Sequence, residues 1–313
     1  MAADDSGAHA KPRPSVTARL LARRPLVLDG ATGTELERRG VRCALPLWSS
    51  WGLIEAPEMV RAVHLDYLRA GVDALTAATF RTHARSLAAA GLEARAAELC
   101  ELAVRLAREA AERGGRDALV LGSAAPLEDC YHPERVPEDD ALAREHARHA
   151  RHLVGAGVDA ILVETINSLR EGVAAARAAR DAGAELLVSF VCDRESRLLS
   201  GEPLAEALDA VAGFAPAAVG VNCVPPGAVM PCLPVLQRAG RPFLVYANLG
   251  APGAPLDAPS DTSPAAFASA ALRWASAGAA CVGGCCGTTP AHLRVLVERL
   301  RREHAPTPIA AAQ

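Results

Sequence analysis

Two adjacent cysteines, Cys285 and Cys286, stand between glycines near the end of the sequence, in the run Gly283-Gly284-Cys285-Cys286-Gly287. Neighbouring cysteines are too close to bridge each other without strain, and along an extended strand their side chains diverge. Their thiols converge only where the backbone bends, which flanking glycines permit. A third cysteine, Cys223, ends the apolar stretch before Pro225. We interpret the three thiols as ligands of one metal ion.

Thiolate sulfur suits Zn(II), and three protein ligands with an open fourth position is the arrangement of catalytic zinc, whereas structural zinc takes four ligands. The sequence has no CxxC or HxxxH motif that would supply a fourth ligand. The alternative is a buried pair of small residues beside a tight turn. That interpretation leaves the flanking glycines without a role.

Two carboxylates also end apolar stretches. Asp29 follows 26–28, and Glu164 follows 159–163. Both are candidates for a binding site at strand ends. For Asp29 the alternative is a helix N-terminal cap, since aspartate before a turn often has that role.

Eight short apolar segments, each followed by a polar or helical segment, must position these residues. We expect strands at 26–28, 74–80, 118–123, 159–163, 186–191, 217–222, 242–248 and 279–283. Helices are predicted at 57–70, 86–112 with a division at Gly91, 139–156, 168–181, 203–211, 227–239, 264–277 and 290–301. This count predicts an α/β fold, a single-domain (β/α)8 TIM barrel, whose strand ends bring the candidate residues around one mouth. A doubly wound open sheet is the alternative.

Composition limits the partners and the compartment. With 313 residues and 50% hydrophobic content, the chain can bury one large core. We predict a disordered N-terminal tail at 1–14, a barrel at 15–303 and a C-terminal tail at 304–313. A net charge of −3 gives no electrostatic case for nucleic acid or an anionic membrane. The longest uncharged run, 210–237, contains five prolines and is no membrane helix. Small-molecule substrates are therefore favoured, and the oligomeric state is not indicated.

Nine cysteines without a secretory context indicate reduced thiols and a cytoplasmic protein. The six outside the candidate centre are expected to be packing or surface residues: Cys43, Cys100, Cys130, Cys192, Cys232 and Cys281. Three histidines, His146, His149 and His152, recur at helical spacing and could suggest a second metal site. Because arginines flank them, we predict a solvated helix face instead.

Several motifs, in order from about residue 26 to 301, together resemble the homocysteine S-methyltransferase family. They are Asp29-Gly30-Ala31-Thr32-Gly33-Thr34-Glu35-Leu36, Leu47-Trp48-Ser49, His64-Leu65-Asp66-Tyr67, Glu164-Thr165, Val221-Asn222-Cys223, Tyr246-Ala247-Asn248 and Gly283-Gly284-Cys285-Cys286-Gly287-Thr288-Thr289-Pro290. The last motif, with the upstream Asn-Cys, is highly specific.

The resemblance implies a barrel that holds Zn²⁺ through Cys223, Cys285 and Cys286, with the sulfur of homocysteine completing the coordination. It implies substrate-binding positions at Asp29, Gly30, Glu164, Trp48 and Asn222. The two carboxylates would hold the homocysteine ammonium, and Trp48 an onium group of the methyl donor.

The implied reaction is transfer of a methyl group from S-methylmethionine or S-adenosylmethionine to homocysteine, an EC 2.1.1 type step of methionine biosynthesis, with no general acid or base. The alternatives are a betaine- or corrinoid-dependent thiol or selenol methyltransferase, and a non-catalytic zinc- or thiol-binding module.

The sequence departs from the family pattern where the donor would bind. Relatives often have Tyr-Gln where this chain has Phe80-Arg81, a Gly-Pro-rich loop at 122–126, and Asn-Ser-Gly at 248–250. An arginine at the mouth would repel a cationic donor unless it pairs with the donor's carboxylate or points away. We expect Arg81 to turn outward or to pair with an acid. The Pro/Gly-rich segment Gly250–Pro259 is a candidate lid.

Overall fold

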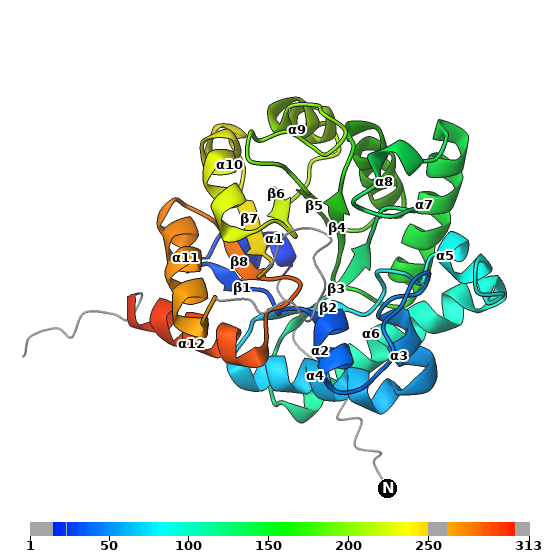
Figure 1. Cartoon of the computed structure of the whole chain (residues 1–313), viewed down its shortest axis with the longest axis horizontal. Helices are drawn as coiled ribbons and strands as arrows, with labels where there is room; N and C mark the ends of the chain where they lie inside the picture. The colour runs from blue at the N-terminus through cyan, green and yellow to red at the C-terminus, as the bar shows by residue number, and fades with distance from the viewer. Residues whose placement is uncertain (1–14, 23, 250–261, 304–313) are drawn as a thin grey trace, which may run out of the picture.

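The computed structural model describes residues 15–22, 24–249 and 262–303. The predicted tails, 1–14 and 304–313, and the candidate lid Gly250–Pro259 lie outside the described residues. Eight parallel strands alternate with helices and form a ring surrounded by those helices (Figure 1). The strands are β1 (Leu26–Val27), β2 (Ala74–Ala77), β3 (Leu119–Ala124), β4 (Ala160–Ile166), β5 (Leu186–Phe190), β6 (Ala218–Asn222), β7 (Phe243–Ala247) and β8 (Cys281–Gly284).

The sheet closes between β1 and β2. Each strand from β2 to β8 pairs with the next, and β8 pairs with β1. Just beyond β1, Leu28 forms a parallel bridge with Ala74. The Asp73 N–H donates to Val27 O at 2.8 Å, and the Asp29 N–H donates to Ala74 O at 3.0 Å. The predicted (β/α)8 TIM barrel is therefore confirmed, and the open-sheet alternative is wrong because no edge strand remains.

The helices that follow the strands lie close to their predicted positions. They are α4 (Pro57–Ala70), α5 (Ala84–Ala88), α6 (Ala96–Arg113), α7 (Asp139–Gly155), α8 (Leu169–Asp181), α9 (Leu204–Ala212), α10 (Pro226–Arg238), α11 (Pro264–Ser276) and α12 (Pro290–Glu303). The predicted division at Gly91 is confirmed. Gly91 has φ +71 between α5 and α6, a conformation that glycine adopts without steric cost.

Three short helices were not predicted: α1 (Val16–Leu20), α2 (Thr32–Arg38) and α3 (Ser50–Glu55). Helix α1 covers the amino end of the barrel. Its Val16 and Leu20 are buried in the same cluster as side chains of the barrel interior. The Glu185 carboxylate, just before β5, accepts hydrogen bonds from the Val16 and Thr17 N–H groups at 3.2 and 2.9 Å.

The strands are apolar throughout because both of their faces are buried. One set of side chains fills the barrel interior, as Leu121 and Leu162 do. Their neighbours Val120 and Ile161 point the other way and pack under the helices. A filled interior leaves room for ligands only at the strand ends.

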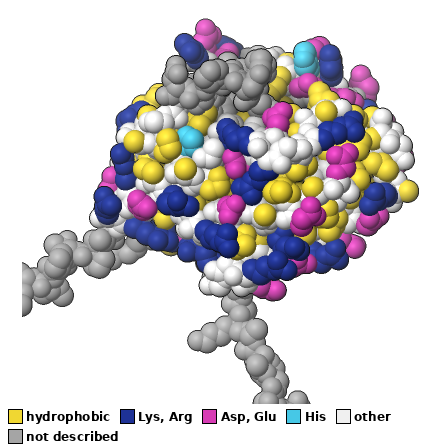
Figure 2. All heavy atoms as spheres, turned by 60° about the horizontal axis from the view of Figure 1, so that its bottom comes forward, with side chains coloured by type: hydrophobic (Ala, Val, Ile, Leu, Met, Phe, Trp, Pro, Cys, Tyr) yellow, Lys and Arg dark blue, Asp and Glu magenta, His cyan; other side chains and the backbone are white. Residues whose placement is uncertain are grey.

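One outer face of the molecule carries arginines and acidic side chains interspersed with apolar ones (Figure 2). Arginines are more frequent along the lower part of this face in Figure 2, with acidic side chains between them. Among the described helices, none combines the length and the apolar character needed to cross a membrane.

Gly220 in β6 provides a test of how tightly neighbouring strands pack. A Cβ atom at this position would lie 2.0 Å from Leu244 O and 2.8 Å from Leu244 C in β7. Because backbone atoms cannot yield, we expect Gly220→Ala to lower the free energy of unfolding by about 3 kcal/mol or more in urea denaturation. Gly213→Ala is the control, since nothing lies within 4 Å of its added Cβ. Equal stability of both variants would contradict this packing.

Candidate metal centre

Three thiols meet at the carboxyl ends of β6 and β8. The Sγ atoms of Cys223, Cys285 and Cys286 all lie within 4.8 Å of one another, and those of Cys223 and Cys286 are 3.8 Å apart. A tetrahedral zinc ion with Zn–S bonds of about 2.3 Å requires sulfurs about 3.8 Å apart. The donor set fits such an ion, and the Cys223–Cys286 separation equals the distance required. That these thiols are its ligands stays a prediction.

The backbone around the cysteines is bent as the glycines predicted. A Cβ at Gly284 would lie 2.3 Å from Thr288 Oγ1, and Gly287 has φ +82. Cys223 itself has φ +52, a left-handed conformation that costs a non-glycine residue about 1 kcal/mol or more. Two bonds to the β7 segment hold it there. The Cys223 N–H donates to Tyr246 O and Asn248 Nδ2 donates to Cys223 O, each at 3.1 Å.

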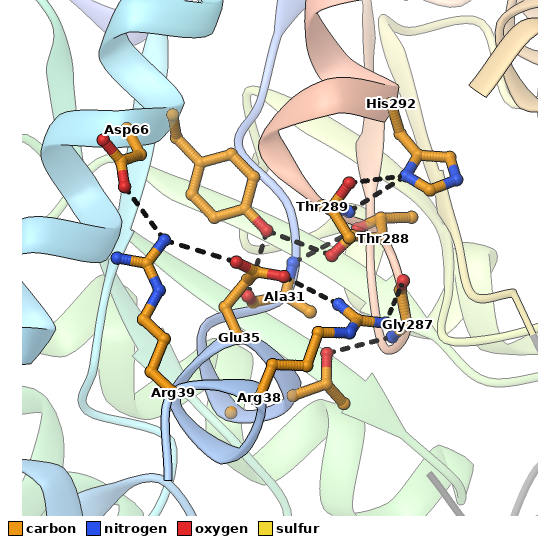
Figure 3. Close-up of polar contacts among 12 residues, drawn as sticks. Ala31, Glu35, Arg38, Arg39, Asp66, Gly287, Thr288, Thr289 and His292 are labelled. Atoms are coloured by element: carbon orange, nitrogen blue, oxygen red, sulfur yellow. Dashed lines mark hydrogen bonds and ion pairs between the residues drawn. The ribbon is translucent and has the colours of Figure 1, made fainter. Parts of the chain in front are cut away.

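Helix α2 supports the loop that carries the cysteine pair (Figure 3). Arg38 Nη2 donates to Gly287 O at 2.9 Å, and its Nη1 pairs with Glu35 Oε1 at 2.7 Å. The Gly287 N–H donates to Thr34 Oγ1 at 3.1 Å. The unpredicted helix α2 therefore fixes the loop after β8 through both backbone groups of one glycine.

Without a metal ion, the contacts among the three sulfurs favour a thiolate at Cys223. Hydrogen bonds from Cys285 and then Cys286 hold the pKa of Cys223 well below the ordinary thiol value. The same contact with Cys223 raises the pKa of Cys285 and of Cys286. A cation placed among the sulfurs would favour the thiolate form of all three.

Asp29 and Glu164 lie beside the thiols in the same cavity. Asp29 is 1% exposed and accepts hydrogen bonds from the Thr76 N–H at 2.9 Å and from Thr76 Oγ1 at 3.0 Å. It does not cap a helix, because α2 begins at Thr32 with Ala31 as its N-cap. Glu164 accepts hydrogen bonds from Ser123 Oγ and, at 3.0 Å, from the Tyr246 hydroxyl.

The environment of both carboxyl groups disfavours their charge. Burial raises the pKa of Asp29 to about 8, against the hydrogen bonds from Thr76, and the nearby Glu164 raises it further. Burial also raises the pKa of Glu164 to about 7, against its bonds from Ser123 and Tyr246. A positively charged ligand between them would reverse this effect by stabilising both carboxylates.

The cavity has a volume of about 870 Å³. Gly30 and Trp48 line the cavity. Contact of these two residues with substrate stays a prediction. The Trp48 indole lies over Gly33, where a Cβ would meet Trp48 Nε1 at 2.4 Å. The volume is ordinary for an enzyme site and is large enough for an amino acid and a second small molecule.

Asn222 does not have the expected place. Its side chain is fully buried and is not among the cavity-lining residues. Asn222 Oδ1 accepts the Thr165 N–H at 2.9 Å, and its Nδ2 donates to Thr165 Oγ1 at 2.8 Å. Thr165 has φ +58, so these bonds hold a strained residue directly after Glu164. Asn222 therefore positions Thr165, and a direct contact of its side chain with substrate stays a prediction.

Arg81 also differs from expectation. It does not turn outward, and it makes no ion pair with any acid among the described residues. Its side chain lies on the cavity wall, the residue is 5% exposed, and Nη1 donates to the backbone oxygen of Glu128 at 2.9 Å. The prediction was wrong because Arg81 follows β2 on a turn that folds toward the mouth, which local composition does not show.

Tyr131 was missed, although its hydroxyl lies 3.1 Å from Cys223 Sγ. Tyr131 belongs to the segment between β3 and α7 and lines the cavity. Its position after a strand of the barrel was the available signal, because loops at that end build the site.

The predicted solvated face of α7 is wrong for two of its histidines. His146 and His149 are each 2% exposed. They continue a buried stripe with Leu142 and Leu153, at the spacing of one helix face. Among the described residues, the group whose ligand atoms lie close enough to share a metal ion is the cysteine trio, and it includes no histidine.

Five of the six other cysteines are buried and one is half-buried, as expected for packing residues. Cys130, one of the buried five, also lines the cavity.

Comparisons with known proteins show which family shares this sequence and fold. The family model of homocysteine S-methyltransferase matches residues 26–300. A homocysteine S-methyltransferase of Escherichia coli (strain K12) is 34% identical, over 88% of this chain and 94% of that protein. A selenocysteine Se-methyltransferase of Brassica oleracea var. italica is 30% identical, over 88% of each chain. The crystal structure of the metallated form of the homocysteine methyltransferase MmuM from Escherichia coli matches with a TM-score of 0.77 and 33% identity, over 90% of this chain and 98% of that one.

The closed barrel, with converging thiols and a substrate-sized cavity at its carboxyl end, defines a TIM-barrel enzyme with a sulfur-rich site able to hold a metal. The matches extend along nearly the whole barrel and agree in sequence and in fold. The chain belongs to the homocysteine S-methyltransferase family and is a methyltransferase, as the motifs predicted.

Removal of one thiol tests the metal assignment. We expect Cys286→Ser to weaken zinc binding by more than about 100-fold, because a hydroxyl is a poor substitute for a thiolate ligand. Competition with a chelator measures the affinity. Cys43→Ser is the matched control, since Cys43 lies outside the trio and its Sγ contacts Gly33 O. Equal zinc affinity in both variants would contradict the assignment.

The buried carboxyl groups predict a pH dependence of stability for the ligand-free protein. Between pH 4 and 8 folded Asp29 keeps a proton that the unfolded chain has released, so stability falls as pH rises through this window. Asp29→Asn removes this titration and should make the decline shallower by up to about 1.4 kcal/mol per pH unit. Denaturant unfolding at pH 5, 6 and 7 measures the slope, and an unchanged slope would argue against a protonated Asp29.

Proposed function

We propose that this protein is a zinc-dependent methyltransferase that moves a methyl group from a sulfonium donor, S-methylmethionine or S-adenosylmethionine, to homocysteine, giving methionine. The observation that supports it most is the trio of thiols, with the spacing of a zinc site, in one cavity with two buried carboxyl groups. A soft metal and an amino acid with a positive end are the ligands that this combination suits.

Zinc, when bound, supplies a thiolate form of the acceptor at neutral pH and a fixed place for its sulfur. Cys223, Cys285 and Cys286 would hold the ion. Three protein ligands are the set typical of catalytic zinc, in which the fourth ligand is water or substrate.

Asp29 and Glu164 would bind the ammonium of the acceptor. Both are held by neutral hydrogen-bond donors from Thr76, Ser123 and Tyr246. These neutral donors orient the two carboxylates but do not neutralise their negative charge. The ammonium of the bound acceptor would do so. An ion pair in this buried place is strong because water is excluded.

The reaction needs no proton transfer from the protein. The acceptor thiolate attacks the methyl carbon of the sulfonium, a new C–S bond forms, and the old C–S bond breaks with its electron pair remaining on the donor sulfur. The donor leaves as a neutral thioether, so no general acid is required. The task of the side chains is to align the two sulfurs with the methyl group between them.

Trp48 would face the cationic donor. Its indole is half-buried on the cavity wall, and an onium group over an indole gains about 0.5–2 kcal/mol. A selenol acceptor is the second candidate, because a relative of 30% identity is named a selenocysteine Se-methyltransferase. Betaine or a corrinoid partner as donor, and a non-catalytic zinc module, are the remaining alternatives. The free thiols that the site requires suit a reducing compartment such as the cytoplasm.

A donor panel tests the proposal. Zinc-loaded protein is incubated with homocysteine and S-methylmethionine, S-adenosylmethionine or betaine, each with an isotope-labelled methyl group, and a parallel series uses selenocysteine. We expect about one zinc per chain and labelled methionine from a sulfonium donor, with turnover at least about 100-fold lower in Cys286→Ser. Turnover with betaine alone, or zinc binding without turnover, would contradict the proposal.

A further inference from the structure

Arg81 is a buried cation that makes no ion pair with any described residue, although the carboxylate of Asp129 also lines the cavity. One of its five N–H donors reaches the backbone oxygen of Glu128, while its buried Nε has no hydrogen-bond partner among the described residues. A buried charge without a counter-charge is strongly unfavourable. Since Arg81 lies on the cavity wall, a bound anion would supply both the missing charge and the missing acceptors.

The geometry of a guanidinium selects the kind of anion. Its planar N–H groups match the two oxygens of a carboxylate in a bidentate pair. The neighbouring Phe80 ring centroid lies 5.5 Å from Arg81 Cζ. An aromatic contact of this kind occupies a face of the guanidinium and competes with no N–H group in its plane.

We propose that Arg81 binds the carboxylate of the methyl donor and makes the protein selective for donors that carry one. This inference rests on the proposed function, in which the donor is a sulfonium amino acid. A cationic donor without a carboxylate would meet an unpaired positive charge, whereas a carboxylate turns the same charge into an attraction.

The position of Arg81 indicates the donor and not the acceptor. The segment 128–131 contacts both Arg81 and the thiol trio. Arg81 donates to the backbone oxygen of Glu128, and the Tyr131 hydroxyl lies 3.1 Å from Cys223 Sγ. The carboxyl groups proposed for the acceptor ammonium are instead held by Thr76, Ser123 and Tyr246. The ammonium and the carboxylate of an amino acid are attached to the same carbon. An acceptor whose ammonium binds Asp29 and Glu164 therefore keeps its own carboxylate near those two residues.

The charge interactions in the cavity agree with separate positions for the acceptor and the donor. Glu164 is the charged group that raises the pKa of Asp29 beyond the effect of burial, and Cys223 has that role for Glu164. The charge of Arg81 affects two other groups, Cys130 and His83. It offsets part of the rise that burial causes in the pKa of Cys130 and adds to the fall that burial causes in the pKa of His83. Because burial keeps the Cys130 thiol protonated, that residue supplies no counter-charge.

The test compares S-methylmethionine with its carboxamide, which keeps the sulfonium and loses the carboxylate. We expect the wild-type protein to prefer the acid by about 10- to 100-fold in kcat/KM, the range of a hydrogen bond to a charged group. Arg81→Met should lose this preference through a lower kcat/KM for the acid alone. Activity with the carboxamide, the KM for homocysteine and the zinc content should stay within about twofold.

Two further variants separate a binding role from a structural one. Arg81→Lys keeps the charge and should retain part of the preference. Arg85→Met is the matched control, since Arg85 pairs with Glu145 at 2.7 Å and Glu128 at 3.0 Å and does not line the cavity. It should keep the full preference. The Tm of Arg81→Met should not fall by more than about 2 °C, because the substitution removes an unpaired buried charge.

An unchanged preference in Arg81→Met, or a rise in the KM for homocysteine in place of the donor effect, would overturn the proposal. If no sulfonium donor supports turnover, the proposed function fails, and donor binding then decides the role of Arg81 separately. Calorimetric titration of S-methylmethionine into zinc-loaded protein should show binding to the wild type that weakens about 10-fold or more in Arg81→Met. Binding that is equal in both proteins, or absent from both, overturns the proposal.

Discussion

Closure of the parallel sheet is the constraint on which the site depends. The bridge between Leu28 and Ala74 joins the first two strands, so the strands form a ring and all carboxyl ends surround one mouth. Residues more than 250 positions apart in sequence, such as Ala31 and Thr288, then lie in hydrogen-bond contact at 3.2 Å. In an open sheet the ends of β1 and β2 would lie at opposite edges, and Asp29 would lose its bonds to Thr76.

Features that are costly for folding gather at this mouth. Cys223 and Thr165 have left-handed backbones, Asp29 and Glu164 are buried carboxyl groups, and Arg81 is a buried cation. Hydrogen bonds from other strand ends hold Cys223, Thr165, Asp29 and Glu164, whereas Arg81 donates to the backbone oxygen of Glu128 in the loop after β3. The rest of the barrel, with its filled interior and apolar strands, provides the stability that these residues lack.

The sequence could predict the barrel and the thiol trio for a clear physical reason. Both features are local in sequence. A continuous apolar run indicates a strand buried on both faces, and the Gly-Gly-Cys-Cys-Gly run indicates a bent backbone that brings thiols together. The short helices α1, α2 and α3 were missed because their stability comes from contacts with distant segments, as in the bonds of α1 to Glu185. A five-residue helix has no periodicity to detect.

Side-chain direction was the part that sequence reasoning could not supply. His149 has arginines on both sides in sequence, yet it faces the core because the helix turns 100° per residue. Asn222 belongs to a motif at the site, but its side chain bonds Thr165 in β4, two strands away. Arg81 was expected to turn outward or to pair with an acid, and only the path of the turn after β2 shows that it lines the cavity wall.

Helix α1 has a consequence for the order of events in the cavity. Because it seals the amino end and the barrel interior is packed, the described residues leave the two reactants to approach from the same side. Asp29, at 1% exposure, lies at the deeper position, so a molecule seated there is covered by whatever binds after it. If the acceptor binds there, as proposed, it enters before the donor, and its methylated form departs after the spent donor.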